Sequence, residues 1–368
     1  MGLMSGTSLD AIDAVLVAFK EHQQPQLIQR SSIVLPNELK NLLTNIAHAS
    51  SVTFRDLAVA EDGLTRLYAQ TALAVIKHLK PEQLPLALGC HGQTLEHQPN
   101  SNPPYTLQLF NPSLLAELTG TNVICDFRRR DLAAGGQAAP LVPAFHHYVF
   151  KSKNQDRIII NLGGIANLTY LPADLNSKVI GFDTGPANLL LDAWYKAHKA
   201  GDYDPAGSNA ASGKLILPLL NLALEDNFFK LVPPKSTGRE YFNPTWLTKL
   251  LQKIPAYQHL AFEDVLCTLT ELTALSLAQQ IKRLDPNQAA EVYICGGGWH
   301  NTYLVSRIQN LIAPRALAAT TQLGIPPQDV EAAAFAWLAW RHYTNQSGNL
   351  PSVTGASGPR ILGGFYPA

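Results

Sequence analysis

The stretch that decides the fold is residues 156–171, DRIIINLGGIANLTYL, in which an apolar strand runs into Gly163-Gly164 and a second strand follows. Residues 1–19, MGLMSGTSLDAIDAVLVAF, repeat this plan around a turn of Gly, Ser and Thr. Two apolar runs joined by a tight turn that contains glycine are typical of a β-hairpin. Two like hairpins about half a chain apart predict two related α/β halves, although two ordinary hairpins would give the same pattern.

Helical and strand patterns alternate along the rest of the chain. Apolar side chains at helical spacing predict amphipathic helices at 264–284 and 330–342, and further strands are predicted at 122–127, 178–183 and 291–295. This alternation indicates an α/β protein. We expect a first domain at 1–125, completed by the tail 345–368, and a second domain at 126–344.

Composition narrows the classes of function. The 368 residues are 46% hydrophobic and 15% charged, with 28 basic and 28 acidic side chains, so the chain is globular and formally neutral. A neutral chain lacks the bulk attraction of nucleic-acid or anionic-membrane binders. Four widely spaced cysteines, with no leader-like N-terminus and no long apolar run, predict a reduced, cytoplasmic protein.

The first candidate for chemistry is the turn after the first strand, residues 5–13, SGTSLDAID. A glycine turn beside hydroxyls can present several closely spaced donors to a phosphate. The same residue types form ordinary turns, so this motif alone leaves a plain turn open. Neither a P-loop nor a G-x-S-x-G elbow occurs, which disfavours a P-loop NTPase and an esterase.

Two further glycine motifs follow apolar strands. Gly163-Gly164, with Asn161 and Asn167, offers a second set of polyphosphate donors or a simple hairpin turn. Residues 296–298 are three consecutive glycines, which let a flat ring approach the backbone closely.

Asp183 is the candidate catalytic group. It lies in GFDTGP, at the predicted junction of a strand and a helix that Gly185-Pro186 opens. A carboxylate there points into the crevice where α/β proteins bind ligands, and it can accept a proton from an attacking oxygen. The alternative is a structural N-cap aspartate.

Loops after two other strands carry His91, in HGQT, and Arg128, in DFRRRD. A guanidinium at such a position can hold a carboxylate through two hydrogen bonds. The alternative for Arg128 is a surface ion pair. The histidines show no spacing typical of metal ligands, so no resident metal site is predicted.

Taken together, two phosphate hairpins and a late glycine motif resemble the acetate/sugar kinase, Hsp70 and actin superfamily. Eight longer stretches narrow the resemblance to one family within this superfamily. In chain order they are GLMSGTSLDAIDA, CHGQTLEHQP, DFRRRDLAAGGQAAPLVPAFH, INLGGIANLTYL, GFDTGPANLLLDAW, PPKSTGREYFN, ICGGGWHN and VEAAAFAWLA. These strings are similar to the anhydro-N-acetylmuramic acid kinase family over essentially the whole chain. The resemblance implies two actin-like (ribonuclease H-like) domains around a central cleft.

The family resemblance also assigns roles to residues. It implies that Asp183 is the catalytic base, that Arg128, Glu331 and His91 bind the sugar, and that Mg²⁺ accompanies ATP. It implies that ATP is bound by Gly6, Thr7, Ser8, Leu9, Asp10, Ala11, Ile12, Asp13, Gly163, Gly164, Gly296, Gly297 and Gly298.

The chain departs from the family pattern at four positions. Ala11, Ala138, Ala187 and Phe110 stand where the family pattern has glycine. A methyl group is tolerated unless φ is positive there, and Phe110 is the larger change.

The implied reaction opens the 1,6-anhydro bridge of anhydro-N-acetylmuramic acid with water and transfers phosphate from ATP to O6. The expected partner is therefore a small anhydro amino sugar, without nucleic acid or membrane, and a homodimer is left open. Two alternatives remain: a kinase for another sugar on the same fold, and a non-catalytic ATP-binding module.

Overall fold

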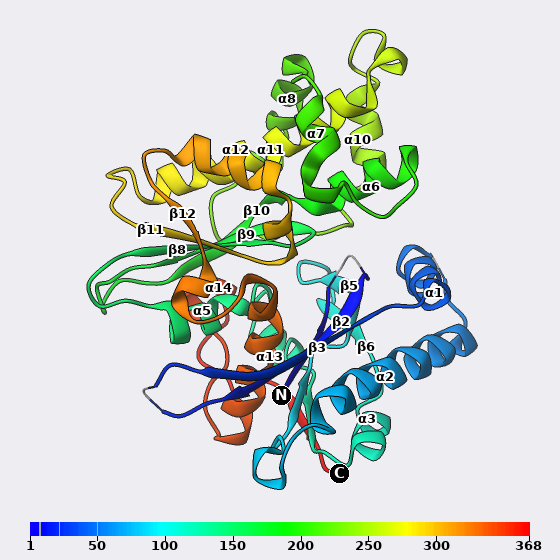
Figure 1. Ribbon diagram of the computed structural model, residues 1–368, viewed down its shortest axis with the longest axis vertical. Helices are drawn as coiled ribbons and strands as arrows, with labels where there is room; N and C mark the ends of the chain where they lie inside the picture. The colour runs from blue at the N-terminus through cyan, green and yellow to red at the C-terminus, as the bar shows by residue number, and fades with distance from the viewer. Residues whose placement is uncertain (7–8, 22, 50) are drawn as a thin grey trace. The chain divides into compact units, whose positions relative to one another are not determined.

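The computed structural model describes residues 1–6, 9–21, 23–49 and 51–368, and its contacts divide the chain into two compact units (Figure 1). Unit 1 comprises Met1–Val149 and Asp329–Ala368. Unit 2 comprises Phe150–Gln328.

Unit 1 contains a six-stranded sheet with the order β13-β7-β4-β1-β2-β3. Strands β1, β2 and β3 form an antiparallel meander, β4 and β7 run parallel to β1, and β13 is antiparallel to β7. Their bounds are β1 Gly2–Ser5, β2 Ala11–Ala18, β3 Gln26–Val34, β4 Leu88–Cys90, β7 Val123–Cys125 and β13 Gly364–Tyr366. A separate hairpin pairs β5 Gln93–Gln98 with β6 Tyr105–Leu109.

The α-helices of unit 1 are α1 Asn37–His48, α2 Phe54–Ile76, α3 Pro112–Thr119, α4 Arg129–Ala133, α5 Val142–Phe150, α13 Val330–Tyr343 and α14 Pro351–Thr354, of which α2, α3 and α13 pack on the sheet. Helix α13 packs closely on β1 and β4 because both strands carry glycine at the contact. A Cβ on Gly2 would lie 1.8 Å from the Ala332 carbonyl oxygen, and one on Gly89 would lie 2.2 Å from that of Phe335. The Ala-rich face of α13 therefore rests directly on the strand backbones.

Unit 2 contains a five-stranded sheet with the order β10-β9-β8-β11-β12. Strands β8, β9 and β10 form an antiparallel meander, and β11 and β12 run parallel to β8. The bounds are β8 Arg157–Leu162, β9 Ile165–Leu171, β10 Ile180–Pro186, β11 Glu291–Cys295 and β12 Leu317–Ala319.

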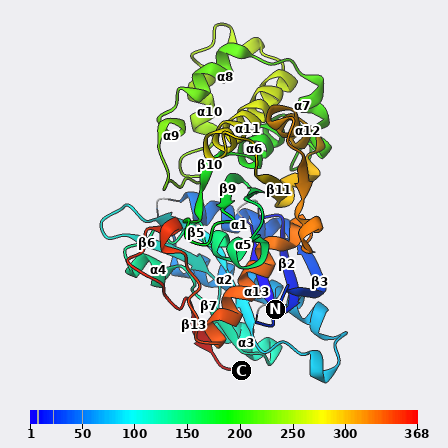
Figure 2. The ribbon, with the colours of Figure 1, turned by 90° about the vertical axis from the view of Figure 1, so that its left-hand side faces the viewer.

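Figure 2 shows the main helices of unit 2 gathered beside its sheet. They are α6 Asn188–His198, α7 Ser208–Ser212, α8 Leu217–Leu224, α9 Asn227–Lys230, α10 Pro244–Leu251, α11 Phe262–Leu284 and α12 Thr302–Ile312. Apolar side chains of α11 and of the strands β8 and β11 meet in one core, in which Ile158, Ile160, Ile294 and Leu277 are fully buried. The sequence predicted α11 and α13 to within two residues.

Both sheets have the same plan: a three-stranded meander followed by two strands parallel to its first strand. The two predicted hairpins, β1-β2 and β8-β9, open each sheet. The α/β class and the pair of actin-like, ribonuclease H-like halves are thus confirmed.

The expected domain boundaries differ from the compact units. Residues 126–149 and 329–344 were expected in the second domain, whereas their contacts lie with unit 1. The reason is packing between segments distant in the chain, since α13 lies on β1, β2 and β4. Asp131 of α4 likewise accepts hydrogen bonds from Asn349 and Thr354, which tie the C-terminal segment to unit 1.

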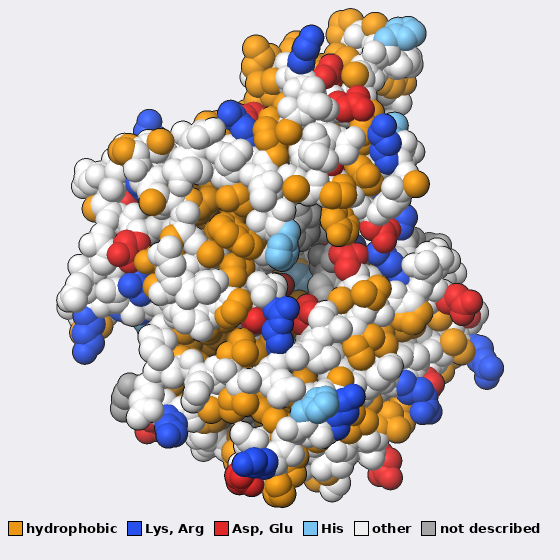
Figure 3. All heavy atoms as spheres, viewed as in Figure 1, with side chains coloured by type: hydrophobic (Ala, Val, Ile, Leu, Met, Phe, Trp, Pro, Cys, Tyr) orange, Lys and Arg blue, Asp and Glu red, His pale blue; other side chains and the backbone are white. Residues whose placement is uncertain are grey.

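The four cysteines are unbridged and buried. Among the described residues, no helix is both long and apolar enough to cross a membrane. On the face drawn in Figure 3, Lys and Arg side chains are interspersed with Asp and Glu, in keeping with the neutral composition.

Candidate active site

Asp183 lies inside strand β10. The strand continues to Pro186, with a register shift against β9 between Asp183 and Gly185. Helix α6 begins only at Asn188, and Ala187 occupies its N-cap position. Gly185-Pro186 therefore ends a strand rather than opening a helix, and the N-cap interpretation of Asp183 is excluded.

The polar loop at 233–243 holds Asp183 at two points. The Asp183 N–H donates to the Lys235 carbonyl at 3.1 Å, and the Thr237 N–H donates to Asp183 Oδ2 at 2.9 Å. Asp183 is only 8% exposed. Backbone donors are fixed by the chain, so this loop sets the orientation of the carboxylate.

Lys235 brings positive charge close to Asp183. Its Nζ donates to the Phe228 carbonyl at 3.1 Å and lies 4.4 Å from the centroid of the Phe228 ring. Burial, with a contribution from Arg283, lowers the pKa of Lys235 to about 8, and the Asp183 carboxylate opposes that shift. The candidate base therefore lies in a poorly hydrated environment, near a buried lysine.

A polar row crosses the sheet of unit 2 at Asp183. Asp183 pairs with Asn167, Asn167 pairs with Asn161, and Asn161 pairs with Cys295. Directly paired residues on neighbouring strands point to the same face of a sheet. Consistent with this, the Cys295 thiol donates to Asn161 Oδ1 at 3.7 Å.

The Gly163-Gly164 turn is fixed to the start of helix α6. The amides of Ala187 and Leu189 donate to the Gly164 carbonyl at 2.9 and 3.0 Å, and the Asn188 amide donates to that of Gly163 at 3.2 Å. The first amides of a helix lack partners within the helix, and here the turn supplies them.

The three glycines at 296–298 follow β11, at the same end of the sheet. A Cβ on Gly296, which has φ +88°, would lie 2.4 Å from Asn161 Oδ1, and one on Gly298 would lie 2.6 Å from Leu162 Cβ. A Cβ on Gly297 would meet nothing within 4 Å. Gly296 and Gly298 are thus required for packing on β8, whereas Gly297 borders open space. The structure brings both predicted glycine motifs of unit 2 together.

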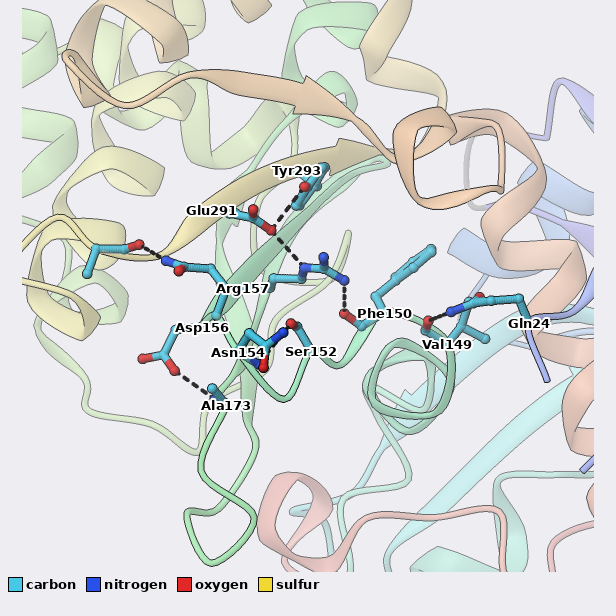
Figure 4. Close-up of polar contacts among 12 residues, drawn as sticks. Gln24, Val149, Phe150, Ser152, Asn154, Asp156, Arg157, Ala173, Glu291 and Tyr293 are labelled. Carbon is cyan, nitrogen blue, oxygen red and sulfur yellow. Dashed lines mark hydrogen bonds and ion pairs between the residues drawn. The ribbon is translucent and has the colours of Figure 1, made fainter. Parts of the chain in front are cut away.

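The register in which β8 pairs with β11 is fixed at the other end of these two strands. Arg157 pairs with Glu291 across β8 and β11, and its Nε donates to Glu291 Oε2 at 2.9 Å (Figure 4). Tyr293 donates to the same carboxylate, and Arg157 Nη1 donates to the Phe150 carbonyl. A slip by one residue would break this cluster and move Asn161 away from Cys295.

In unit 1, the predicted phosphate residues Gly6, Leu9 and Asp10 lie between β1 and β2, and the others that the structure describes lie at the start of β2. Leu9 has φ +55° and its N–H donates to the Gly6 carbonyl at 3.2 Å, while Asp10 forms an exposed ion pair with Lys40. Ala11 begins β2 and Ile12 is fully buried. Thr7 and Ser8 lie outside the described residues.

Asp13 lies farther along β2, beside a second carboxylate. Burial raises its pKa, against the opposing effects of a Ser32 hydrogen bond and the Arg30 charge. Arg30 Nη1 is 3.2 Å from Asp329 Oδ1, and burial also raises the pKa of Asp329, with Asp13 adding to the shift. Two carboxylates therefore share one half-exposed guanidinium.

Arg128, His91 and the start of α13 form a second cluster in unit 1. Nε and Nη2 of Arg128 approach His91 Nε2 at 3.1 and 3.0 Å, and Nη1 donates to the Ala138 carbonyl at 2.7 Å. Burial and the Arg128 charge hold the pKa of His91 well below its usual range, so the imidazole is neutral and accepts. Its ring lies 4.6 Å from that of Phe335, one helical turn after Glu331.

These contacts show what orients Arg128. Its guanidinium is held by a buried histidine and a backbone carbonyl. His91 is 6% exposed and supports Arg128, a role that its position in a loop motif did not indicate.

The four departures from the family pattern differ in effect. Ala138 has φ +56°, a conformation that favours glycine, and its N–H donates to Asp131 Oδ2. Phe110 is buried against Tyr68, and its ring lies beside Gly92. Ala11 lies in a strand, and Ala187 has φ −125°, so neither requires glycine by its φ.

The contact of Thr237 with Asp183 was not predicted, because it is made by a backbone N–H, for which side-chain patterns give no signal. Asp131, the last residue of the DFRRRD motif, was expected only as a polar group on a loop after a strand. It instead lies fully buried in α4 and accepts hydrogen bonds from Ala138, Asn349 and Thr354.

The family model that matches this chain and the similar proteins found by comparison have the same name. The chain matches the family described as anhydro-N-acetylmuramic acid kinase over residues 1–368. It is 46% identical to the protein of that name from Saccharophagus degradans, with 100% of this chain and 98% of that one covered. Identity is 44% for Shewanella pealeana and 43% for Pasteurella multocida, covering 100% of this chain and 98% and 96% of theirs.

Among solved structures, the activator of the 2-hydroxyisocaproyl-CoA dehydratase from Clostridium difficile, with bound ADPNP, aligns with a TM-score of 0.45 and 13% identity. The alignment covers 94% of this chain and 95% of that one. The family match, by contrast, spans every residue of the sequence, and this chain belongs to the anhydro-N-acetylmuramic acid kinase family.

Proposed function

We propose that this protein uses ATP to convert 1,6-anhydro-N-acetylmuramic acid to N-acetylmuramic acid 6-phosphate, a step of cell-wall sugar recycling. The main support for the proposal is that Asp183 is a buried carboxylate held by the 233–243 loop. The chain also matches the family model over its full length.

Asp183 acts as general base in this proposal. It takes a proton from a water molecule whose oxygen bonds the anomeric carbon, C1. The bond from C1 to the bridging oxygen breaks and leaves its electron pair on O6. O6 then bonds the γ-phosphorus of ATP, and ADP departs. A fixed carboxylate suits this role because the reaction depends on positioning.

The glycine motifs supply the nucleotide contacts. Gly297 borders open space, whereas Gly296 and Gly298 are packed, which supports a role for Gly297 next to the adenosine. Gly163-Gly164 and the turn before β2 are the glycine motifs that we propose for the phosphate groups, because tight glycine turns are a common site of anion binding.

Mg²⁺ fits the acidic side chains of unit 1. An ion that accompanies ATP is held mostly by phosphate oxygens and water, with one or two carboxylates of the protein. Asp13, next to the phosphate turn, is the carboxylate that would hold it. When bound, the ion offsets negative charge on the transferred phosphoryl group.

Arg128 and Glu331 are proposed as sugar-binding residues of unit 1. The Arg128 guanidinium is oriented by His91 and the Ala138 carbonyl, which suits recognition of the lactyl carboxylate of the sugar. His91 then serves the substrate through Arg128. We further propose a cytoplasmic enzyme without nucleic-acid or membrane partners, since the thiols are unbridged and the chain is neutral.

A substrate comparison tests the proposal. The protein is incubated with ATP and either anhydro-N-acetylmuramic acid, the anhydro-N-acetylglucosamine analogue or common hexoses, and products are read by mass spectrometry. We expect phosphorylation of the muramic sugar, and Arg128→Ala should raise KM mainly for that lactyl-bearing substrate. Efficient turnover of an ordinary hexose alone would support the alternative of a different sugar kinase.

A further inference from the structure

Two polar atoms beside Asp183 have no partner within the described part of the chain. They are Asn167 Oδ1 and Thr237 Oγ1, both buried from solvent. Asn167 is the direct cross-strand partner of Asp183, and Thr237 is the residue whose N–H holds the Asp183 carboxylate. A buried polar group without a hydrogen-bond partner is costly, so two such groups around one carboxylate indicate a bound polar molecule.

Their chemistry defines that molecule. Asn167 Oδ1 and the Asp183 carboxylate can only accept hydrogen bonds, whereas the Thr237 hydroxyl can donate one. A molecule that serves all three must donate two hydrogen bonds and accept one from a single small atom. Water does this and keeps a lone pair for attack. A sugar hydroxyl has one O–H and cannot satisfy both acceptors.

We infer that Asn167 and Thr237 are positioning residues that hold the nucleophilic water against Asp183. The inference rests on the proposed function and adds to it the residues that select water as nucleophile. As the water oxygen bonds C1, one proton passes to Asp183. Asn167 keeps the second hydrogen bond, and the Thr237 hydroxyl fixes the direction of the remaining lone pair.

Shape-conserving variants test the inference. Thr237→Val removes the hydroxyl but keeps the backbone N–H that holds Asp183, and Asn167→Leu removes the amide at similar volume. We expect each to lower kcat about tenfold to a hundredfold, with KM for ATP and sugar changed by less than about twofold. Thr237→Ser, which restores the hydroxyl, should stay within about threefold of the parent. Thr248→Val, the same change on the exposed face of α10, is the matched control and should leave kcat unchanged.

Competition between water and methanol gives a readout that a merely structural role would not move. Methanol has one O–H and cannot satisfy both acceptors, so the parent should strongly favour water. In Asn167→Leu, the ratio of methyl glycoside 6-phosphate to free sugar 6-phosphate should rise about tenfold, the equivalent of one hydrogen bond. If Asn167→Leu does not fold, Asn167→Ser, whose shorter side chain does not reach the water, is expected to show the same rise.

The outcomes separate the inference from the proposed function. Folded Thr237→Val and Asn167→Leu proteins with parental kcat and parental methanol ratio would overturn the inference alone. A parent protein that yields no phosphorylated sugar would instead overturn the proposed function.

Discussion

A substitution at Gly297 should affect ligand binding without affecting folding. A Cβ there meets nothing, whereas Cβ atoms on Gly296 and Gly298 would overlap β8. Gly297→Val should therefore keep the melting temperature and weaken ATP binding at least about tenfold, since a branched side chain would fill space meant for the nucleoside.

Calorimetric titration with ATP and a thermal melt make the comparison. The matched control, Gly298→Val, should lower the melting temperature because its side chain overlaps Leu162. Unchanged ATP affinity in Gly297→Val would mean that the triple glycine is only a turn.

Ala138 stores local strain beside Arg128. Its φ of +56° is costly for alanine and free for glycine. Ala138→Gly should therefore raise the free energy of unfolding by about 0.5–1 kcal/mol, measured by urea titration. Ala133→Gly, on the exposed side of α4, is the control and should lower it by a similar amount. A loss of stability in both variants would contradict the strain assignment.

At the scale of elements, helix α13 depends on glycines in the strands that it covers. Gly89→Ala would place a methyl 2.2 Å from the Phe335 carbonyl oxygen, and the helix would have to move. We expect a cost of about 1–3 kcal/mol in the free energy of unfolding. The same change at Gly63, inside α2, meets Leu39 at an ordinary 3.4 Å and should stabilise by about 0.5–1 kcal/mol. Chemical denaturation of both variants checks the opposite signs, and two equal losses would contradict the packing argument.

Local patterns in the sequence predicted the elements well and their long-range partners poorly. The hairpins and the helices α11 and α13 follow from turn glycines and apolar periodicity, which are local signals. The place of α13 on β1 and β4 depends on contacts between residues such as Gly2 and Ala332, far apart in the chain. Likewise, its motif made Asp183 a candidate, but the hydrogen bond from Thr237 to Asp183 was not predicted, because a backbone donor in an irregular loop has no side-chain pattern.

At the scale of the whole molecule, the two units repeat one sheet plan but carry different chemistry. Unit 2 holds the candidate base, its loop and two glycine motifs, while unit 1 holds the Arg128–His91 cluster and the carboxylates around Arg30. The activity proposed for the chain joins ring opening to phosphoryl transfer, and the central claim is that one carboxylate, Asp183, directs water to C1 while O6 receives the phosphoryl group.

The reaction in ¹⁸O-water tests that claim most directly. The protein is incubated with ATP and anhydro-N-acetylmuramic acid, and the product is fragmented in a mass spectrometer. We expect one heavy oxygen on C1, none in the transferred phosphoryl group, and no product from a folded Asp183→Asn protein. A phosphorylated sugar with its anhydro ring intact, or heavy oxygen in the phosphoryl group, would contradict it.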